Sequence, residues 1–188
     1  MSLLLLEAAR DALGVAKNDD FNGAQQEGIG RYQTTIRDGI RCSTALAYLE
    51  PAATRPNLQI VSDALVTRID VERGRAVGIT YRKAGQTHSV RASREVIVSA
   101  GAVGSPHLLL LSGIGPAADL KRHGVEVVAD LPGVGKNLQD HVIAALPWDD
   151  ASGTASHLNP LSMLAWFLRH LATKTGPMAS NAVEGGGF

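Results

Sequence analysis

Apolar and polar positions along the chain follow two periods, and each period predicts its own kind of element. Runs rich in β-branched residues and bounded by turn formers predict strands at 58–62 continuing into 64–71, at 75–82 and at 87–92. The short connections at 72–74 and 84–86 are typical of a β-meander. The middle of the chain is therefore expected to form a small sheet of consecutive strands.

Helical spacing of apolar residues occurs on both sides of these strands. The predicted helices are 2–13, one that starts at Ser43 and ends at Pro51, 116–123 and 161–173. Asn159 and Pro160 are expected to cap the last of these helices. Residues 18–35 and 131–139 are predicted as loops, and 125–129 as a short strand.

A strand, a glycine turn and a helix are predicted in sequence between residues 95 and 113. The run 95–99 (EVIVS) predicts a buried strand, and the helix is expected to begin at Ser105 and Pro106 and to end at Gly113. The turn between them consists of residues with little or no side chain, namely Ala100, Gly101, Ala102 and Gly104. Backbone without large side chains can approach a ligand closely.

This unit resembles the second signature of the glucose-methanol-choline (GMC) oxidoreductase family, flavoenzymes that use FAD to oxidise alcohols. The matching positions are Gly101, Ala102, Ser105, Pro106, Leu108, Leu109, Ser112, Gly113, Ile114 and Gly115. Residues 19–69, 133–141 and 176–188 also resemble family segments, so the similarity covers nearly the whole chain. It implies an α/β fold with α+β character, in which residues 1–146 belong to the FAD-binding domain and 147–188 begin the substrate-binding domain.

The resemblance also implies binding residues. Ala100, Gly101 and Ala102 are expected beside the bound FAD, and the backbone N–H and C=O of Val66 are expected to meet its adenine. Glu184 is expected to face the substrate cavity, where its carboxylate would attract a quaternary ammonium group or accept a hydrogen bond from a hydroxyl group. Each of these residues also has a structural interpretation. Val66 is equally typical of a sheet core, and Gly101 and Gly104 are typical of close packing between a helix and a strand. Glu184 is typical of a carboxylate on a solvent-facing strand.

Two parts of the family pattern are missing from this sequence. Members of the family begin with a strand, a GxGxxG turn and a helix that hold the ADP half of FAD, and their catalytic histidine lies near the end. Residues 113–118 match GxGxx(G/A) as a string but follow a helix, which excludes a dinucleotide fingerprint. We therefore expect an internal fragment of a longer flavoenzyme, inactive alone, with its catalytic base outside this chain.

Adjacent Asp140 and His141 invite interpretation as a catalytic pair, but neighbouring loop residues rarely face the same proton. They are expected instead to belong to turns. The histidines have no metal-ligand spacing, and Cys42 is the one cysteine, which excludes an internal disulfide and a thiolate metal cluster. Cysteine usage favours the cytoplasm.

Composition narrows the classes of partner. The chain has 188 residues, 19% of them charged, and a formal net charge of +0, which argues against nucleic acid or an anionic membrane as a partner. No apolar run approaches the roughly 18 residues of a membrane-spanning helix.

The expected reaction of the parent enzyme, by resemblance, is oxidation of a small-molecule alcohol to an aldehyde, with hydride transfer to flavin N5. A non-catalytic flavin-fold or interaction module and a lyase of the same family are the alternatives. The sequence leaves the identity of the alcohol and the choice between dehydrogenase and oxidase open, because the electron acceptor is selected by residues around the flavin.

Overall fold

A computed structural model describes residues 2–144, 159–181 and 183–188 of the chain. The chain forms two compact units, which are described separately: a terminal unit of Met1–Leu58 with Leu146–Phe188, and a central unit of Gln59–Ala145. The predicted domain boundary between 146 and 147 lies outside the described residues. The assignment of the two parts to cofactor and substrate domains stays a prediction.

The centre of the central unit is an antiparallel sheet with the strand order β4-β5-β6. Its strands are β4 (Leu65–Glu72), β5 (Arg75–Lys83) and β6 (Gln86–Arg91), and Ile69 on β4 lies opposite Ile79 on β5. Left-handed residues form both turns, Arg73 with Gly74 and Ala84 with Gly85, as tight hairpins require. The predicted meander is confirmed, but the run 58–62 forms no strand.

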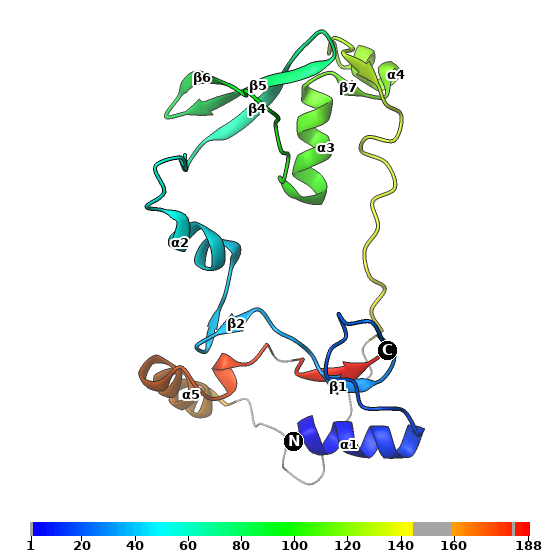
Figure 1. Cartoon of the computed structure of the whole chain (residues 1–188), viewed down its shortest axis with the longest axis vertical. Coiled ribbons are helices and arrows are strands. Elements are labelled where there is room, and N and C mark those ends of the chain that lie inside the picture. The colour runs from blue at the N-terminus through cyan, green and yellow to red at the C-terminus, as the bar shows by residue number, and fades with distance from the viewer. Residues whose placement is uncertain (1, 145–158, 182) are drawn as a thin grey trace. The chain divides into compact units, whose positions relative to one another are not determined.

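Helix α3 (Gly101–Leu111) packs against β4 (Figure 1). Gly113 has φ +79° and ends this helix, as predicted. The chain then forms β7 (Ile114–Gly115), α4 (Ala117–Arg122) and β8 (Ala129–Asp130). The two short strands pair in parallel, and the predicted strand at 125–129 is reduced to β8, which starts where Gly113 O accepts hydrogen bonds from Val128 and Ala129.

Two predictions for the segment before α3 were wrong. Residues 95–99 form no strand, because their backbone pairs with no other strand in the described part of the chain. They are nevertheless extended, with Val96 and Val98 half-buried and Ile97 between them 78% exposed. Helix α3 begins at Gly101 rather than at Ser105, so Pro106 lies inside the helix.

The terminal unit contains α1 (Ser2–Leu13) and, far apart in sequence, β1 (Ile29–Arg31) and β9 (Gly185–Gly187), which pair antiparallel. The rings of Phe21, Tyr32 and Phe188 pack together beside this pair. Its other elements are β2 (Ile36–Arg37), β3 (Ile40–Arg41), the π-helical turn η1 (Ala45–Leu49), α2 (Glu50–Ala52), α5 (Pro160–Thr173) and the 3-10 turn η2 (Pro177–Ala179).

Helices α1 and α5 agree with the predictions. In α5, the side chain of Asn159 accepts a hydrogen bond of 2.8 Å from the backbone N–H of Ser162, as an N-cap should. Pro51 does not end the second predicted helix. It lies within α2, and α2 directly follows the π-helical turn η1. Strand β1 falls in a stretch predicted as a loop.

Candidate functional site

A groove of about 540 Å³ lies in the central unit between β4, the extended segment 96–100 and α3. Val66 and Leu65 contribute one wall from β4, and His107, Leu108 and Leu111 contribute another from α3. Ala100 closes the end near the start of α3, and the remaining lining is mostly aliphatic. An apolar slot with few polar groups suits a flat ring system.

The groove brings together two of the residues that sequence comparison selected, Val66 and Ala100. Val66 is half-buried, and Ala100 is exposed at the N-cap of α3. Because β4 is an edge strand, part of its backbone is not used by the sheet. Backbone N–H and C=O groups are therefore available along this wall of the groove.

Gly101 and Ala102 follow Ala100 in the first turn of α3 and are exposed. Gly101 has φ +83°, and apart from its two chain neighbours and the backbone of its own helix, no described heavy atom lies within 4 Å of the place where a Cβ would stand. No side chain of the described part caps this turn, so its N–H groups keep their hydrogen-bonding capacity. The turn thus offers donors and the positive end of the helix dipole to an anionic group.

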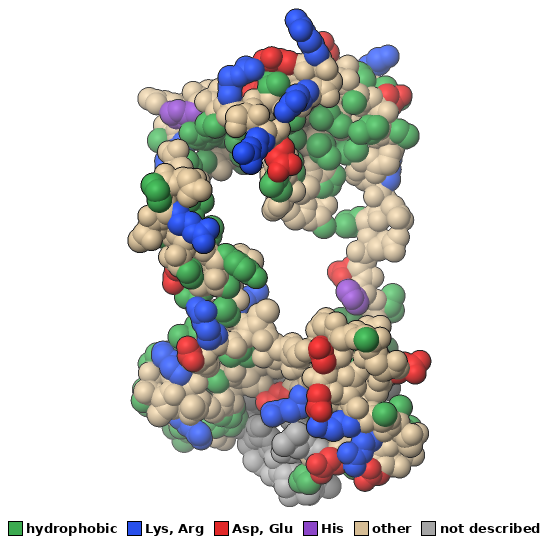
Figure 2. All heavy atoms as spheres, viewed as in Figure 1, with side chains coloured by type: hydrophobic (Ala, Val, Ile, Leu, Met, Phe, Trp, Pro, Cys, Tyr) green, Lys and Arg blue, Asp and Glu red, His purple; other side chains and the backbone are tan. Residues whose placement is uncertain are grey.

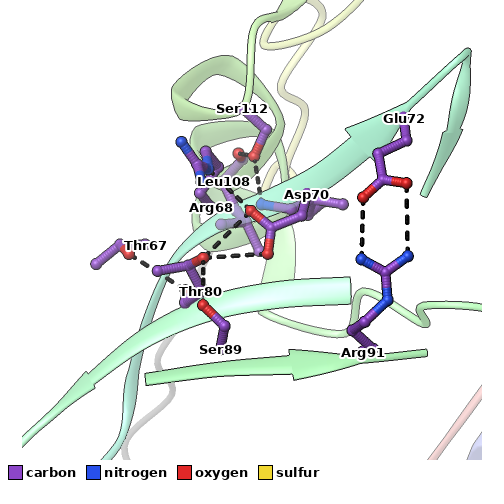
Figure 3. Close-up of polar contacts among 10 residues, drawn as sticks. Thr67, Arg68, Asp70, Glu72, Thr80, Ser89, Arg91, Leu108 and Ser112 are labelled. Atoms are coloured by element: carbon purple, nitrogen blue, oxygen red, sulfur yellow. Dashed lines mark hydrogen bonds and ion pairs between the residues drawn. The ribbon is translucent and has the colours of Figure 1, made fainter. Parts of the chain in front are cut away.

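Hydroxyl groups fix both ends of α3. The Ser105 hydroxyl accepts a hydrogen bond of 3.0 Å from the backbone N–H of Ala100. Ser105, a residue within the helix, therefore stabilises the turn at its start. At the other end, the Ser112 hydroxyl accepts a bond of 2.8 Å from the Ile69 N–H and donates one of 2.6 Å to the Leu108 carbonyl (Figure 3). These contacts hold the helix in place along β4.

Two ion pairs lie on the meander, Arg68 with Asp70 and Arg91 with Glu72. The Arg91 guanidinium donates to both carboxylate oxygens of Glu72, at 2.9 and 3.5 Å (Figure 3). The hydrogen bond and the positive charge of Arg91 lower the pKa of the Glu72 carboxyl below its usual value. Nearby, Asp70 accepts from Thr80 and Arg68. This network has the character of a solvated sheet surface.

Glu184 lies in the terminal unit, directly before β9. Its Oε1 accepts a hydrogen bond of 2.8 Å from the Ser180 hydroxyl, and its carbonyl accepts one of 3.0 Å from the Tyr32 N–H. The side chain is half-buried and lines a cavity of about 370 Å³ with Arg31 and Asn181. Strand β9 begins directly after Glu184, where the glycines lie against β1.

Asp140 and His141 form no buried pair. Their side chains are 97% and 94% exposed, with 3.5 Å between Oδ1 and Nδ1. No group of three potential metal ligands occurs among the described residues. Acidic and basic side chains are interspersed on the face drawn in Figure 2, in keeping with the balanced charge.

The sequence profile of the GMC oxidoreductases matches residues 2–143. The chain belongs to the GMC oxidoreductase family. Human (Homo sapiens) mitochondrial choline dehydrogenase is 46% identical over 97% of this chain and 31% of that protein. An alcohol dehydrogenase (acceptor) of Pseudomonas putida is 43% identical over 93% of this chain and 32% of that protein. The chain thus spans about a third of the length of the curated relatives it matches.

A solved structure of an FAD-dependent oxidoreductase has a similar fold. An FAD-dependent oxidoreductase from Chaetomium thermophilum, 28% identical, superposes with a TM-score of 0.71 over 92% of this chain and 31% of that one. The mixed helix and strand fold expected for a GMC oxidoreductase is therefore confirmed. In the described part of the chain, no helix has the length and apolar character needed to cross a membrane.

The family resemblance predicts Val66 and Ala100 as cofactor-binding residues, and these two residues line one groove, whereas the contacts of two serines were not predicted. Ser105 and Ser112 are matched positions of the signature, but the sequence predicts only that Ser105 begins the helix and indicates no contact for Ser112. Their functions depend on Ala100 and Ile69, which no local pattern connects to them. The sequence offered one signal for such a contact: the family signature specifies a serine, Ser112, at the end of an otherwise apolar helix.

Proposed function

We propose that this chain forms part of an FAD-dependent alcohol dehydrogenase and holds the adenosine end of FAD in the groove between β4 and α3. The observation that carries the proposal is that Val66 and Ala100 line one groove in a chain of the GMC family. The names of the relatives support the substrate class, since one is a choline dehydrogenase and another an alcohol dehydrogenase. Both names describe oxidation of a CH–OH group.

The residues present fit this cofactor. The aliphatic lining would cover the adenine ring, and the free edge of β4 at Val66 would offer backbone hydrogen bonds to its polar rim. The first turn of α3, next to Ala100, would bind the diphosphate through the N–H groups of Gly101 and Ala102 and the helix dipole. The small side chains there would leave room for it.

When bound, FAD supplies the oxidant that accepts hydride from the α-carbon of the alcohol. The residues of this chain bind and orient one end of the cofactor and exclude water from the apolar groove. The base that removes the hydroxyl proton is a histidine in the family, and we place it outside this chain. Dehydrogenase and oxidase activity are both compatible with these roles.

A chimeric enzyme tests the proposed cofactor role. Residues 1–188 would replace the matching third of the Pseudomonas putida alcohol dehydrogenase, and flavin absorbance of the purified protein would be measured. Ala100→Phe should abolish flavin retention by filling the groove, whereas the matched control Ala118→Phe, on the exposed part of α4, should retain it. Full flavin content in Ala100→Phe would contradict the assignment of the groove.

We further propose that Glu184 lines the substrate cavity of the complete enzyme. Its half-buried carboxylate, held by Ser180, would attract a cationic alcohol. In the chimera, Glu184→Gln retains shape but removes the charge, so kcat/KM should fall about tenfold more for a cationic alcohol than for a neutral alcohol of similar size. Equal losses for the two alcohols would assign Glu184 a structural role instead.

A further inference from the structure

Ser112 is the one buried polar residue among the described residues, with 5% of its surface exposed. Its hydroxyl group uses its single proton on the carbonyl of Leu108 and accepts the N–H of Ile69 (Figure 3). A hydroxyl is suited to this place because one atom both donates and accepts. The function proposed above assigns no task to this residue.

The two partners of Ser112 belong to different elements. Ile69 is a buried residue of the edge strand β4, and its N–H points out of the sheet toward α3. Leu108 lies one turn before Ser112 on α3. Within the described part of the chain, the Ile69–Ser112 bond is the one hydrogen bond that joins β4 directly to α3. It also satisfies a buried N–H that would otherwise lack a partner.

The same two elements are the walls of the groove. Leu108 lines it from α3, and Val66 lines it from β4, three residues before Ile69. Ile79, which lies opposite Ile69 in the sheet, lines it as well. Ser112 itself does not line the groove but a neighbouring cavity on the meander. Its hydroxyl therefore connects β4 and α3, the two walls, from outside the groove.

We propose that Ser112 is a positioning residue that sets the separation of the two groove walls and so the affinity of the groove for an adenosine group. The proposal rests on the proposed function of the groove. Loss of the hydroxyl would leave the Ile69 N–H unpaired and free β4 to move relative to α3. The groove would then lose its fixed width even though every lining side chain is unchanged.

A pair of isosteric variants isolates the hydroxyl. Ser112→Thr keeps it, and Ser112→Val has the shape of the threonine variant without it. In the 188-residue chain, Ser112→Val should bind AMP about three- to tenfold more weakly than Ser112→Thr, measured by NMR titration. Amide hydrogen exchange at Ile69 should be faster in the valine variant. The control Ser89→Ala, which removes an exposed hydroxyl on β6, should change neither quantity.

Each other outcome overturns part of the proposal in a recognisable way. Equal AMP affinities of the two variants would show that Ser112 has a structural role alone, even if exchange at Ile69 becomes faster. If the unaltered chain binds no AMP at millimolar concentration, the proposed function of the groove fails, and this inference fails with it. If the branched side chains unfold the central unit, Ser112→Ala against the unaltered chain provides the same comparison.

Discussion

At the scale of single residues, Gly101 combines open surroundings with a backbone conformation that other residues rarely adopt. Its φ of +83° makes any β-carbon costly, by about 1 kcal/mol. We predict that Gly101→Leu lowers the free energy of unfolding of the chain by about this amount, measured by urea denaturation. In the chimera it should also reduce flavin absorbance, because the side chain enters the space next to Ala100.

Gly101→Asn is the matched control, since asparagine tolerates positive φ better than leucine does. Gly101→Asn should retain most of the free energy of unfolding. Any loss of flavin in this variant would then come from the added side chain and not from backbone strain. A leucine variant with the flavin content of the unaltered chimera would contradict the cofactor role of Gly101, whatever its stability.

Glu72 provides a test of the electrostatics of the meander. Arg91 lowers the pKa of its carboxyl, so this pair stabilises the folded chain above the usual titration range of a glutamate. The contribution is lost as the pH falls through the lowered pKa. We predict that Arg91→Gln raises the pKa of Glu72 toward its usual value, as measured by NMR titration of the side-chain carbon. An unchanged titration would show that the ion pair is absent in solution.

At the scale of elements, the N-cap of α5 is a local interaction whose strength can be measured. Asn159→Ala removes the acceptor for the Ser162 N–H and should destabilise the first turn of α5 by about 1 kcal/mol. Amide hydrogen exchange at residues 162 and 163 would report this loss. Asn159→Asp keeps an acceptor in place and should show little change, so equal exchange in both variants would contradict the cap.

Elements that depend on local sequence were predictable, and those that depend on distant partners were not. The meander follows from alternating apolar runs and tight turns, and α1 and α5 follow from helical spacing. Strand β1 has only three residues, and its partner β9 lies near the other end of the chain, so no local pattern indicates either. The segment 95–99 has the composition of a strand but lacks a hydrogen-bonding partner in the described part.

The same reasoning separates the predictable from the unpredictable parts of the site. The turn at Ala100 and Gly101 was found because its small residues recur in a family signature. Val66 and Ala100 line one groove, and their contact with the cofactor stays a prediction. The bond between Ser112 and Ile69 was not found, because it joins residues 43 positions apart through one hydroxyl group.

At the scale of the whole molecule, the chain matches about a third of the length of its curated relatives. We predict that the 188-residue chain with added FAD oxidises no primary alcohol, because its sequence contains neither the GxGxxG turn nor the terminal histidine of the family. Reduction of a dye acceptor would measure this, with the chimera as the positive control. Sustained turnover by the chain alone would contradict the prediction.

The location of the protein in the cytoplasm, inferred from cysteine usage, also stays a prediction.

The pairing of β1 with β9 has a consequence for the order in which the chain folds. The central unit consists of one continuous stretch, Gln59–Ala145, so it can form without the rest of the chain. Strand β1 can pair only when residues 185–187 are present. Closing the long loop between the two strands costs conformational entropy before their contacts can stabilise it. The terminal unit is therefore expected to fold after the central unit.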